Sequence, residues 1–252
     1  FLAQAASDEQ VMNLTQTKLF DTDRAGRLVE KGIDGELREY NDENYTYYGI
    51  ADIKKARRTK ANYTVYRITI RDDLLFSDGQ PITIDDVIFS LYAFCDNDYD
   101  GNVQLKSSNI RGLLNYQANN AQAESYTDKQ VKKYIRKKPA ALQKWMQKHS
   151  SDESGYESAL ERQARYLMAK QAKKKTRVNS IEGIKRLNDY ELRIYTTGYD
   201  SRFEEKLQIP ICPLHYYGDT TKYSYNANKF GFKRGDLSAI RANKSCLLYT
   251  SD

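Results

Sequence analysis

A single stretch, residues 63–94, carries the clearest pattern of apolar and polar positions in the chain. Residues 63–70 are rich in β-branched and aromatic side chains that alternate in part with polar ones, which predicts a half-buried strand. The apolar run 74–76 is followed by Ser77-Asp78-Gly79, whose short polar side chains and glycine are typical of a tight turn. Over residues 84–94 apolar side chains recur at helical spacing, and we expect this helix to bury one face.

The start of this helix has the residues of a capped N-terminus. Pro81 favours an extended approach, and the Thr83 hydroxyl can accept a hydrogen bond from an otherwise unpaired N–H group of the first turn. Asp85 and Asp86 place negative charge where the helix dipole favours it. We therefore expect Asp78, Asp85 and Asp86 to serve the turn and the cap, and not to act as catalytic acids or ligands.

Three further helices are predicted between residues 127 and 177. Thr127 opens the first of them, and Pro139 separates it from the second. Beyond them, residues 181–195 predict two antiparallel strands joined by an Asn-Asp turn, whereas residues 30–61 predict loops with small strands. The apolar residues that mark the three helices are Val131, Tyr134 and Ile135, then Leu142, Trp145 and Met146, and finally Leu160, Ala164, Leu167 and Met168.

The composition indicates a globular chain whose surface is polar and hydrated. Its 252 residues, 40% of them hydrophobic, are enough to bury a core in one large or two ordinary domains. Tyrosine dominates the aromatic residues, with 21 Tyr against 8 Phe and 1 Trp, and it combines apolar area with a polar tip. No apolar run approaches the roughly 18 residues of a membrane helix. The start at Phe1 shows no intact signal peptide, so we expect an internal or processed end.

The residues that ligate metals or cofactors are too scattered to predict a site. Cys95, Cys212 and Cys246 include no C-x-x-C pair, and the two histidines lie near no cluster of ligand spacing. Residues 96–101 match the first half of a calcium loop, D-x-D-x-D-G, but its twelfth position is Ser107 where a bidentate acid is needed. We expect no metal and no cofactor.

Catalytic motifs are missing as well. The sequence contains no G-x-S-x-G, no G-x-x-x-x-G-K-[ST] and no H-E-x-x-H. A glycosidase-like pair of carboxylates stays an alternative that no particular residues support. The sequence predicts that the chain is not an enzyme.

The positive charge belongs to one segment. Residues 129–177 contain 15 Lys and Arg against 4 Asp and Glu, a balance of +11, whereas the rest of the chain carries −5. A solvated helical hairpin attracted to an anionic membrane or cell-wall surface would explain this segment. The alternative is a nucleic-acid-binding protein, with these cations on phosphates and Tyr134 or Trp145 stacking on bases. No helix-turn-helix, zinc-finger or RNA-recognition signature accompanies the charge.

Several motifs in order along the chain resemble one family. Ile68-Thr69-Ile70-Arg71, Phe76-Ser77-Asp78-Gly79, Pro81, Thr83, Asp86-Val87 and Ser90 resemble the signature of the extracellular solute-binding proteins, family 5, of peptide-type ABC importers. That family includes oligopeptide, dipeptide and nickel binders. The hairpin 181–195 and the segment 209–217 are similar to further elements of the family, and residues 230–238 to its gut-bacterial members. In this light His215 is a structural feature of the family.

The resemblance implies an α/β fold of the periplasmic-binding-protein type II, which has two lobes. It implies that this chain is the amino-terminal lobe only, with a basic helical insert. We expect residues 1–126 and 178–243 to form the lobe, residues 127–177 the insert, and residues 244–252 a non-native tail. That tail stands where the family continues with a G-x-G-P-Y strand.

The same resemblance implies a function and a short segment, residues 15–17, that faces the ligand. It implies capture of peptides or another small polar solute outside the cytoplasmic membrane, and delivery to the permease subunits of an ABC importer. Thr15, Gln16 and Thr17 stand at the corner that the family places at the cleft mouth, although an ordinary polar turn would explain them too. We expect a monomer, periplasmic or held at the cell surface by a lipid anchor absent from this stretch, with no nucleic-acid partner. With one lobe missing, the fragment is expected to bind peptides weakly or not at all.

Overall fold

The computed structural model describes residues 16–101, 103–149, 151 and 154–242. The chain divides into two compact units. Unit 1 comprises Phe1–Ile110 together with Gly183–Asp252, and unit 2 comprises Arg111–Glu182. The expected tail at residues 244–252, Thr15 and Cys246 lie outside the described residues. Among the residues that are described, no helix has the length and apolar character needed to cross a membrane.

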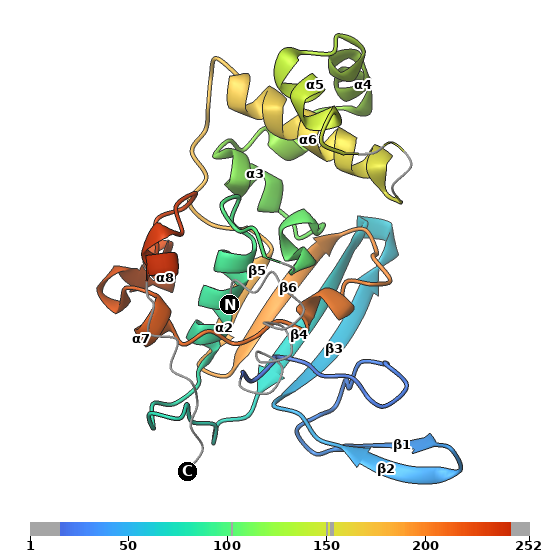
Figure 1. The fold of residues 1–252 in the computed structure, drawn as a ribbon, viewed down its shortest axis with the longest axis vertical. Helices are drawn as coiled ribbons and strands as arrows, with labels where there is room; N and C mark the ends of the chain where they lie inside the picture. Colours follow the sequence, from blue (N-terminus) through green and yellow to red (C-terminus); the bar gives the residue numbers. More distant parts are fainter. Residues whose placement is uncertain (1–15, 102, 150, 152–153, 243–252) are drawn as a thin grey trace. The chain divides into compact units, whose positions relative to one another are not determined.

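Unit 1 is built on a four-stranded antiparallel sheet in the order β3-β4-β6-β5 (Figure 1). The strands are β3 (Ala51–Arg58), β4 (Tyr63–Ile70), β5 (Ile184–Asn188) and β6 (Glu191–Thr197). In the centre, Ile68 of β4 lies opposite Ile53 of β3 on one side and Leu192 of β6 on the other. The predicted strand at residues 63–70 and the predicted hairpin at residues 181–195 are thereby confirmed.

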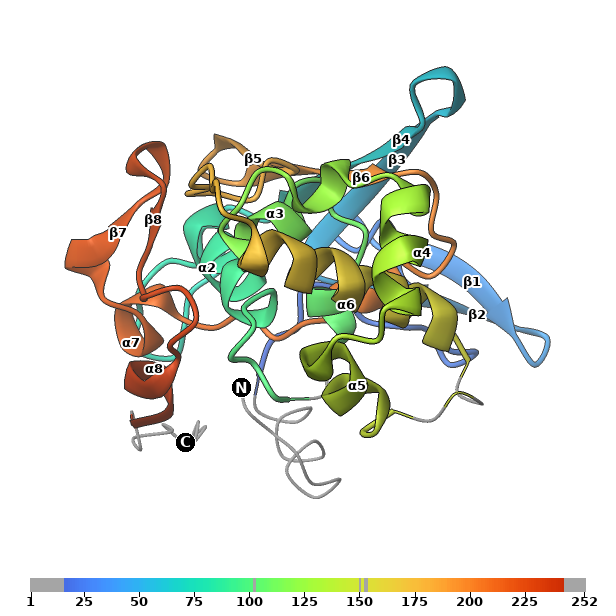
Figure 2. The same cartoon turned by 90° about the horizontal axis from the view of Figure 1, so that it is seen from above.

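Strand β3 is longer than the small strands expected between residues 30 and 61. Its residues Lys54–Arg58 are exposed on both faces, because the tip of the β3–β4 hairpin stands out from the sheet (Figure 2). A strand with charged residues on both faces shows no alternation of apolar and polar positions. Sequence pattern alone therefore does not reveal it.

Helix α2 (Ile84–Phe94) lies beside β5 on one face of the sheet (Figure 1). It begins as predicted, with Thr83 as N-cap and Asp86 completing a capping box. The expectation that it buries one face was wrong, because every residue except Asp85 is buried. The sheet covers one side, and the segment around Phe230 covers the other, where the rings of Tyr92 and Phe230 stack at 3.5 Å.

The remaining elements of unit 1 are short. A hairpin of β1 (Glu36–Tyr40) and β2 (Glu43–Tyr47) turns at Asn41 and Asp42, which take positive φ angles of 53° and 63°. Asparagine and aspartate tolerate this left-handed conformation better than most residues. The other elements are η1 (Thr59–Ala61), η2 (Gln104–Ser107), η4 (Glu205–Leu207), α7 (Leu214–Tyr217), η5 (Thr220–Lys222), β7 (Tyr223–Ser224), η6 (Tyr225–Ala227), β8 (Lys229–Phe230) and α8 (Ser238–Ala242).

Unit 2 is helical, and its three predicted helices are present. They are α4 (Asp128–Arg136), α5 (Ala140–Met146) and α6 (Tyr156–Gln171), preceded by α3 (Leu113–Ala118) and η3 (Ala123–Ser125). Val131, Leu142, Leu160 and Ala164 form a shared core, as their helical spacing predicted. Helix α3 was not predicted, since it is only six residues long and lies in the Asn- and Gln-rich stretch 102–123. The assignment of residues 127–177 as an insert in a lobe stays a prediction.

Candidate functional site

The predicted ligand-facing corner begins a short two-stranded ladder in unit 1. The Leu19 N–H donates to the Ile209 carbonyl at 2.8 Å, and the Ile211 N–H donates to the Thr17 carbonyl at 2.9 Å. Lys18 and Pro210 lie opposite each other between these bonds. Leu19, Ile209 and Ile211 are buried, so the ladder is fixed to the core on one side.

Two of the three predicted site residues are described, and they differ in exposure. The Thr17 side chain is exposed, whereas Gln16 is partly buried. The Oε1 atom of Gln16 is buried and has no hydrogen-bond partner among the described residues. A buried acceptor without a partner costs about 1–3 kcal/mol, and a donor from a ligand or a water would remove that cost. Gln16 and Thr17 stay predicted site residues.

The segment after the ladder, where α7 begins, is fixed to helix α2 by a buried carboxylate. Asp86 is 5% exposed, and its Oδ1 atom accepts from the Leu214 N–H at 2.9 Å while Oδ2 accepts from the Thr83 N–H at 2.9 Å. Burial raises the pKa of Asp86, although these N–H groups favour the ionised form. Asp86 is thus the predicted cap residue and, in addition, the anchor of residues 213–214. The sequence did not indicate this second role.

A second polar link joins the same two segments. The Ser90 hydroxyl donates to the Asp86 carbonyl at 2.8 Å and accepts from the Cys212 N–H at 2.8 Å. Cys212 itself is fully enclosed, and burial raises the pKa of its thiol to about 12. At neutral pH this thiol stays protonated and packs as a small apolar group.

Asp78 and Asp85 also make structural contacts; Asp78 serves the predicted turn, whereas the long-range partners of Asp85 were not predicted. Asp78 accepts from His215 at 2.7 Å, and the Gln80 N–H and His215 together lower the pKa of Asp78. Asp85 accepts from Arg186 Nε at 2.8 Å and from the Tyr223 hydroxyl at 2.7 Å. Asp78 therefore links its turn to His215 of α7, and Asp85 links α2 to Arg186 of β5.

The carboxylates of the half-matched calcium loop contact groups of the chain itself. Asp96 accepts from the Gly235 N–H at 2.8 Å, and Asp98 accepts from Arg241 at 2.5 Å. Asp100 pairs with the same arginine at 3.1 Å. Within the described part of the chain, no group of three or more His, Cys, Asp or Glu is placed to hold a metal ion.

One shallow groove of about 420 Å³ lies at the turn between β5 and β6. It is lined by Thr69, Asn188, Asp189, Tyr190 and Glu191. Its two carboxylates are already engaged, Asp189 with Arg186 at 2.5 Å and Glu191 with Arg67. Neither carboxylate of the groove is therefore free for a ligand, which makes the groove the weaker candidate.

A comparison with known families identifies the family of the chain. The family model described as "Bacterial extracellular solute-binding proteins, family 5 Middle" matches residues 50–232. The chain belongs to this family. The match spans the sheet, α2 and the segment 209–214 that pairs with the Gln16 corner. It also confirms the resemblance found in the motifs of residues 68–90.

Two solved structures are partly similar to the chain. One is titled "Lactococcal OppA complexed with an endogenous peptide in the closed conformation", with 16% identity, a TM-score of 0.46 and coverage of 85% of this chain and 27% of that one. The other is titled "Listeria monocytogenes OppA bound to peptide", with 16% identity, a TM-score of 0.41 and coverage of 86% and 30%. The chain thus spans under a third of the length of either protein. No curated protein sequence matches the chain.

The mixed α/β architecture and the family match agree with the expected fold class, part of a two-lobed solute-binding protein. The family is one of extracellular binding proteins, as its description states. Sequence reasoning missed the ladder between Thr17 and Ile211 and the anchoring role of Asp86. Both join residues more than a hundred positions apart. Local patterns hold no signal for such pairs.

Proposed function

We propose that this chain is part of the substrate-binding component of an ABC importer, and that its solute is a peptide. The family match over residues 50–232 carries the proposal. The peptide-type signature around Phe76-Ser77-Asp78-Gly79, now seen to form the turn before α2, supports the same choice. Both solved structures are titled as peptide complexes, so peptides are the first ligands to test.

The corner at Gln16 offers what an extended peptide needs. Peptides present one N–H donor for most residues and an ammonium group at the amino terminus. The Gln16 side chain, whose Oε1 is buried without a partner, accepts one of these donors once it turns toward the solute, and the exposed Thr17 beside it carries a hydroxyl that can donate or accept. The buried ladder behind holds both in place, which limits the entropy that binding costs.

The proposal places the protein outside the cytoplasmic membrane with the permease subunits as partners. It acts as a monomer, periplasmic or held to the cell surface by a lipid anchor. The family's description as extracellular supports this placement. Binding then requires no catalysis, in keeping with a family of binding proteins.

The test uses the full-length gene product that carries this chain. Isothermal titration with a pool of three- to six-residue peptides, and separately with nickel ions, distinguishes the main solute classes of the family. We expect saturable heat from peptides and none from nickel. Saturable binding of nickel without peptide binding would replace the proposal by a metal importer, and binding of neither would leave another small polar solute in its place.

A further inference from the structure

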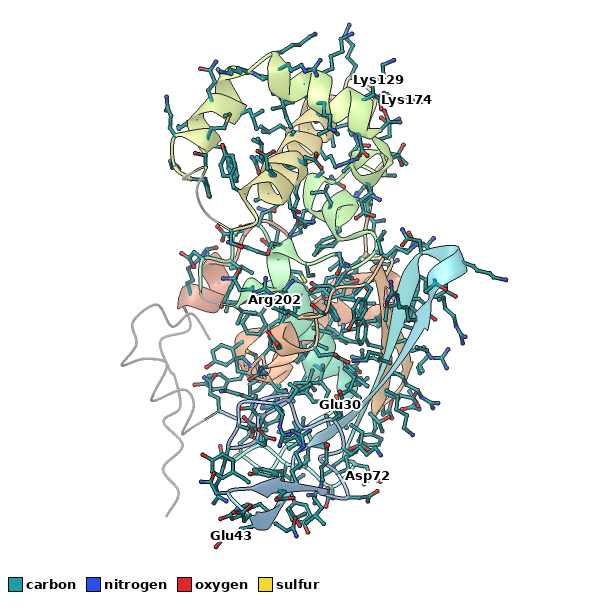
Figure 3. All side chains as sticks on the ribbon, turned by 90° about the vertical axis from the view of Figure 1, so that its right-hand side faces the viewer. Glu30, Glu43, Asp72, Lys129, Lys174 and Arg202 are labelled. Carbon is teal, nitrogen blue, oxygen red and sulfur yellow. The ribbon has the colours of Figure 1, made fainter. Side chains whose placement is uncertain are left out.

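Unit 2 carries the chain's excess positive charge. It contains 16 Lys and Arg against 7 Asp and Glu, a net +9, whereas the rest of the chain totals −3. Figure 3 shows two of these cations, Lys129 and Lys174, projecting outward from the helical unit. A surface of this charge attracts anions strongly, provided that its own acids do not neutralise it.

Most described acids of unit 2 are already engaged in its own fold. Glu124 accepts from the backbone N–H groups of Gly112 at 2.9 Å and Leu114 at 3.0 Å. Asp128 pairs with Arg165 at 2.6 Å, and Glu182 pairs with Arg111 at 2.9 Å. The Lys and Arg side chains outside these pairs therefore have few nearby carboxylates to neutralise their charge.

The uncompensated cations gather where α4 and α6 end. We define the basic patch as the exposed residues Lys132, Lys133, Arg136, Lys137, Lys138, Lys173, Lys174, Lys175 and Arg177. None of them forms an ion pair among the described residues. The Tyr134 hydroxyl of α4 contacts Gln171, the last residue of α6, at 3.1 Å, so the last turn of α4 reaches the end of α6.

Helix dipoles explain only part of this arrangement. A cation within the last turn of a helix is stabilised by the dipole, but the effect fades beyond that turn. Helix α6 ends at Gln171, and Lys173–Lys175 and Arg177 follow in a non-helical segment. Their exposure and number call for another explanation, which is a partner of opposite charge.

The aromatic residues of unit 2 indicate which anionic partner fits. Trp145, Tyr134 and Tyr156 pack against the core formed by α4, α5 and α6, and Tyr126 and Tyr166 pack against the neighbouring core. None of the large hydrophobic residues found exposed in the described chain belongs to unit 2. The unit thus presents charge without aromatic platforms for stacking bases, which single-stranded nucleic-acid binders use. It also presents no apolar wedge to insert into a bilayer.

We propose that the basic patch adsorbs the protein electrostatically to an anionic lipid bilayer. An extracellular protein of bacteria meets such a surface in the phosphate headgroups of the membrane. Phosphates need only be approached by flexible cationic side chains, which the patch supplies. This proposal does not depend on which solute the protein binds, so membrane adsorption and solute binding can be tested in separate experiments.

Vesicle sedimentation tests this inference with the full chain. We expect binding to vesicles that contain phosphatidylglycerol, none to pure phosphatidylcholine, and release on raising sodium chloride from about 0.1 M to about 0.5 M. The variant K173E/K174E/K175E is expected to weaken binding by at least about tenfold. The control K54E/K60E/K229E makes the same charge change at exposed lysines of unit 1 and is expected to weaken it less than about threefold.

A second variant separates charge from folding. Lys138 adopts a positive φ of 44°, a conformation in which glycine is less strained. Lys138→Gly therefore removes one charge of the patch while keeping or improving the fold, and we expect about threefold weaker vesicle binding with unchanged circular dichroism. Equal binding to both vesicle types, equal loss in the unit 1 control, or binding to DNA or polyphosphate but not to vesicles would overturn the proposal.

Discussion

The two units of this chain use their charged side chains in opposite ways. In unit 1 arginines and aspartates far apart in the sequence are paired, as in Arg186 with Asp85 and Arg241 with Asp98. In unit 2 the described ion pairs are Arg165 with Asp128 and Arg111 with Glu182, and most lysines stand exposed beside them.

This difference separates charges that hold the fold from charges left for a partner. A buried or partly buried pair fixes the geometry of the segments it joins, and removing one member leaves the other group unsatisfied. An exposed, unpaired lysine contributes almost nothing to folding. Substitutions in the two units should therefore have effects of different size on stability.

The largest effect is expected at Asp86. Asp86→Ala removes the acceptor of the Leu214 and Thr83 N–H groups in a buried site, and we expect a loss of about 3 kcal/mol in the free energy of unfolding. Urea denaturation measures it. Asp85→Ala, one residue earlier and partly exposed, is the comparison and should cost clearly less. An equal cost for the two would contradict the anchoring role assigned to Asp86.

The raised pKa of Asp86 also predicts a pH dependence of stability that differs from that of another buried acid, Asp23. Because the folded pKa of Asp86 is raised, its contribution is present at low pH and declines as pH rises through that pKa. The advantage of the wild type over Asp86→Asn should therefore shrink as pH rises from 4 to 7. An advantage that grows over this range would contradict the assigned direction.

A further effect is expected at Asp23, a buried carboxylate in the turn before β1. It accepts from Arg38 at 2.7 Å and from Arg27 at 2.8 Å, and these guanidinium groups, with backbone N–H donors, outweigh burial and lower the pKa of Asp23. Its contribution is thus present above pH 4 and lost as pH falls through the lowered pKa. Asp23→Asn should lower the thermal midpoint at pH 7, and the gap from wild type should narrow in acid. Asp21→Asn, an exposed neighbour, should change neither.

A small effect is expected from the exposed ion pair of unit 2. Asp128 is 76% exposed in its pair with Arg165, so Asp128→Asn should cost less than about 1 kcal/mol of unfolding free energy. Chemical denaturation monitored by the fluorescence of Trp145, which lies in the same unit, measures it. A cost of several kcal/mol would mean that unit 2 depends on charge pairing as unit 1 does.

The smallest effect on stability is expected from the basic patch itself. Reversing Lys173, Lys174 and Lys175 should change the unfolding free energy by no more than about 0.5 kcal/mol, because all three are exposed and unpaired among the described residues. The same variant is expected to bind vesicles more weakly, so the effect on binding would be separate from the effect on folding. A large loss of stability would instead assign these lysines to the fold.

The elements that sequence could predict are those with local signals. The partial alternation of residues 63–70, the cap at Thr83 and the helical spacing of unit 2 each depend on neighbours along the chain, and each was confirmed. Strand β3 could not be predicted, because Lys and Arg occupy both of its faces near the tip. The near-complete burial of α2 depends on residues around Phe230, which helical periodicity cannot report.

The candidate site was only partly predictable for the same reason. The family resemblance indicated Thr15, Gln16 and Thr17, but the pairing of Thr17 with Ile211 forms across nearly two hundred residues. The buried, unpartnered Oε1 of Gln16 is a property of packing that no local pattern contains. The family was evident from local motifs, whereas the anchoring contact of Asp86 and the pairing of Thr17 with Ile211 are visible only in three dimensions.

The proposal that Gln16 faces the solute is tested most directly by peptide titration of three forms of the full-length gene product. Gln16→Leu removes the unpartnered acceptor at similar volume, whereas Gln80→Leu makes the same change at an exposed position away from the ladder. We expect peptide binding with a Kd about tenfold weaker for Gln16→Leu, equivalent to about 1.4 kcal/mol, and unchanged for Gln80→Leu. Unaltered affinity in Gln16→Leu, or no peptide binding by the wild type, would contradict the account.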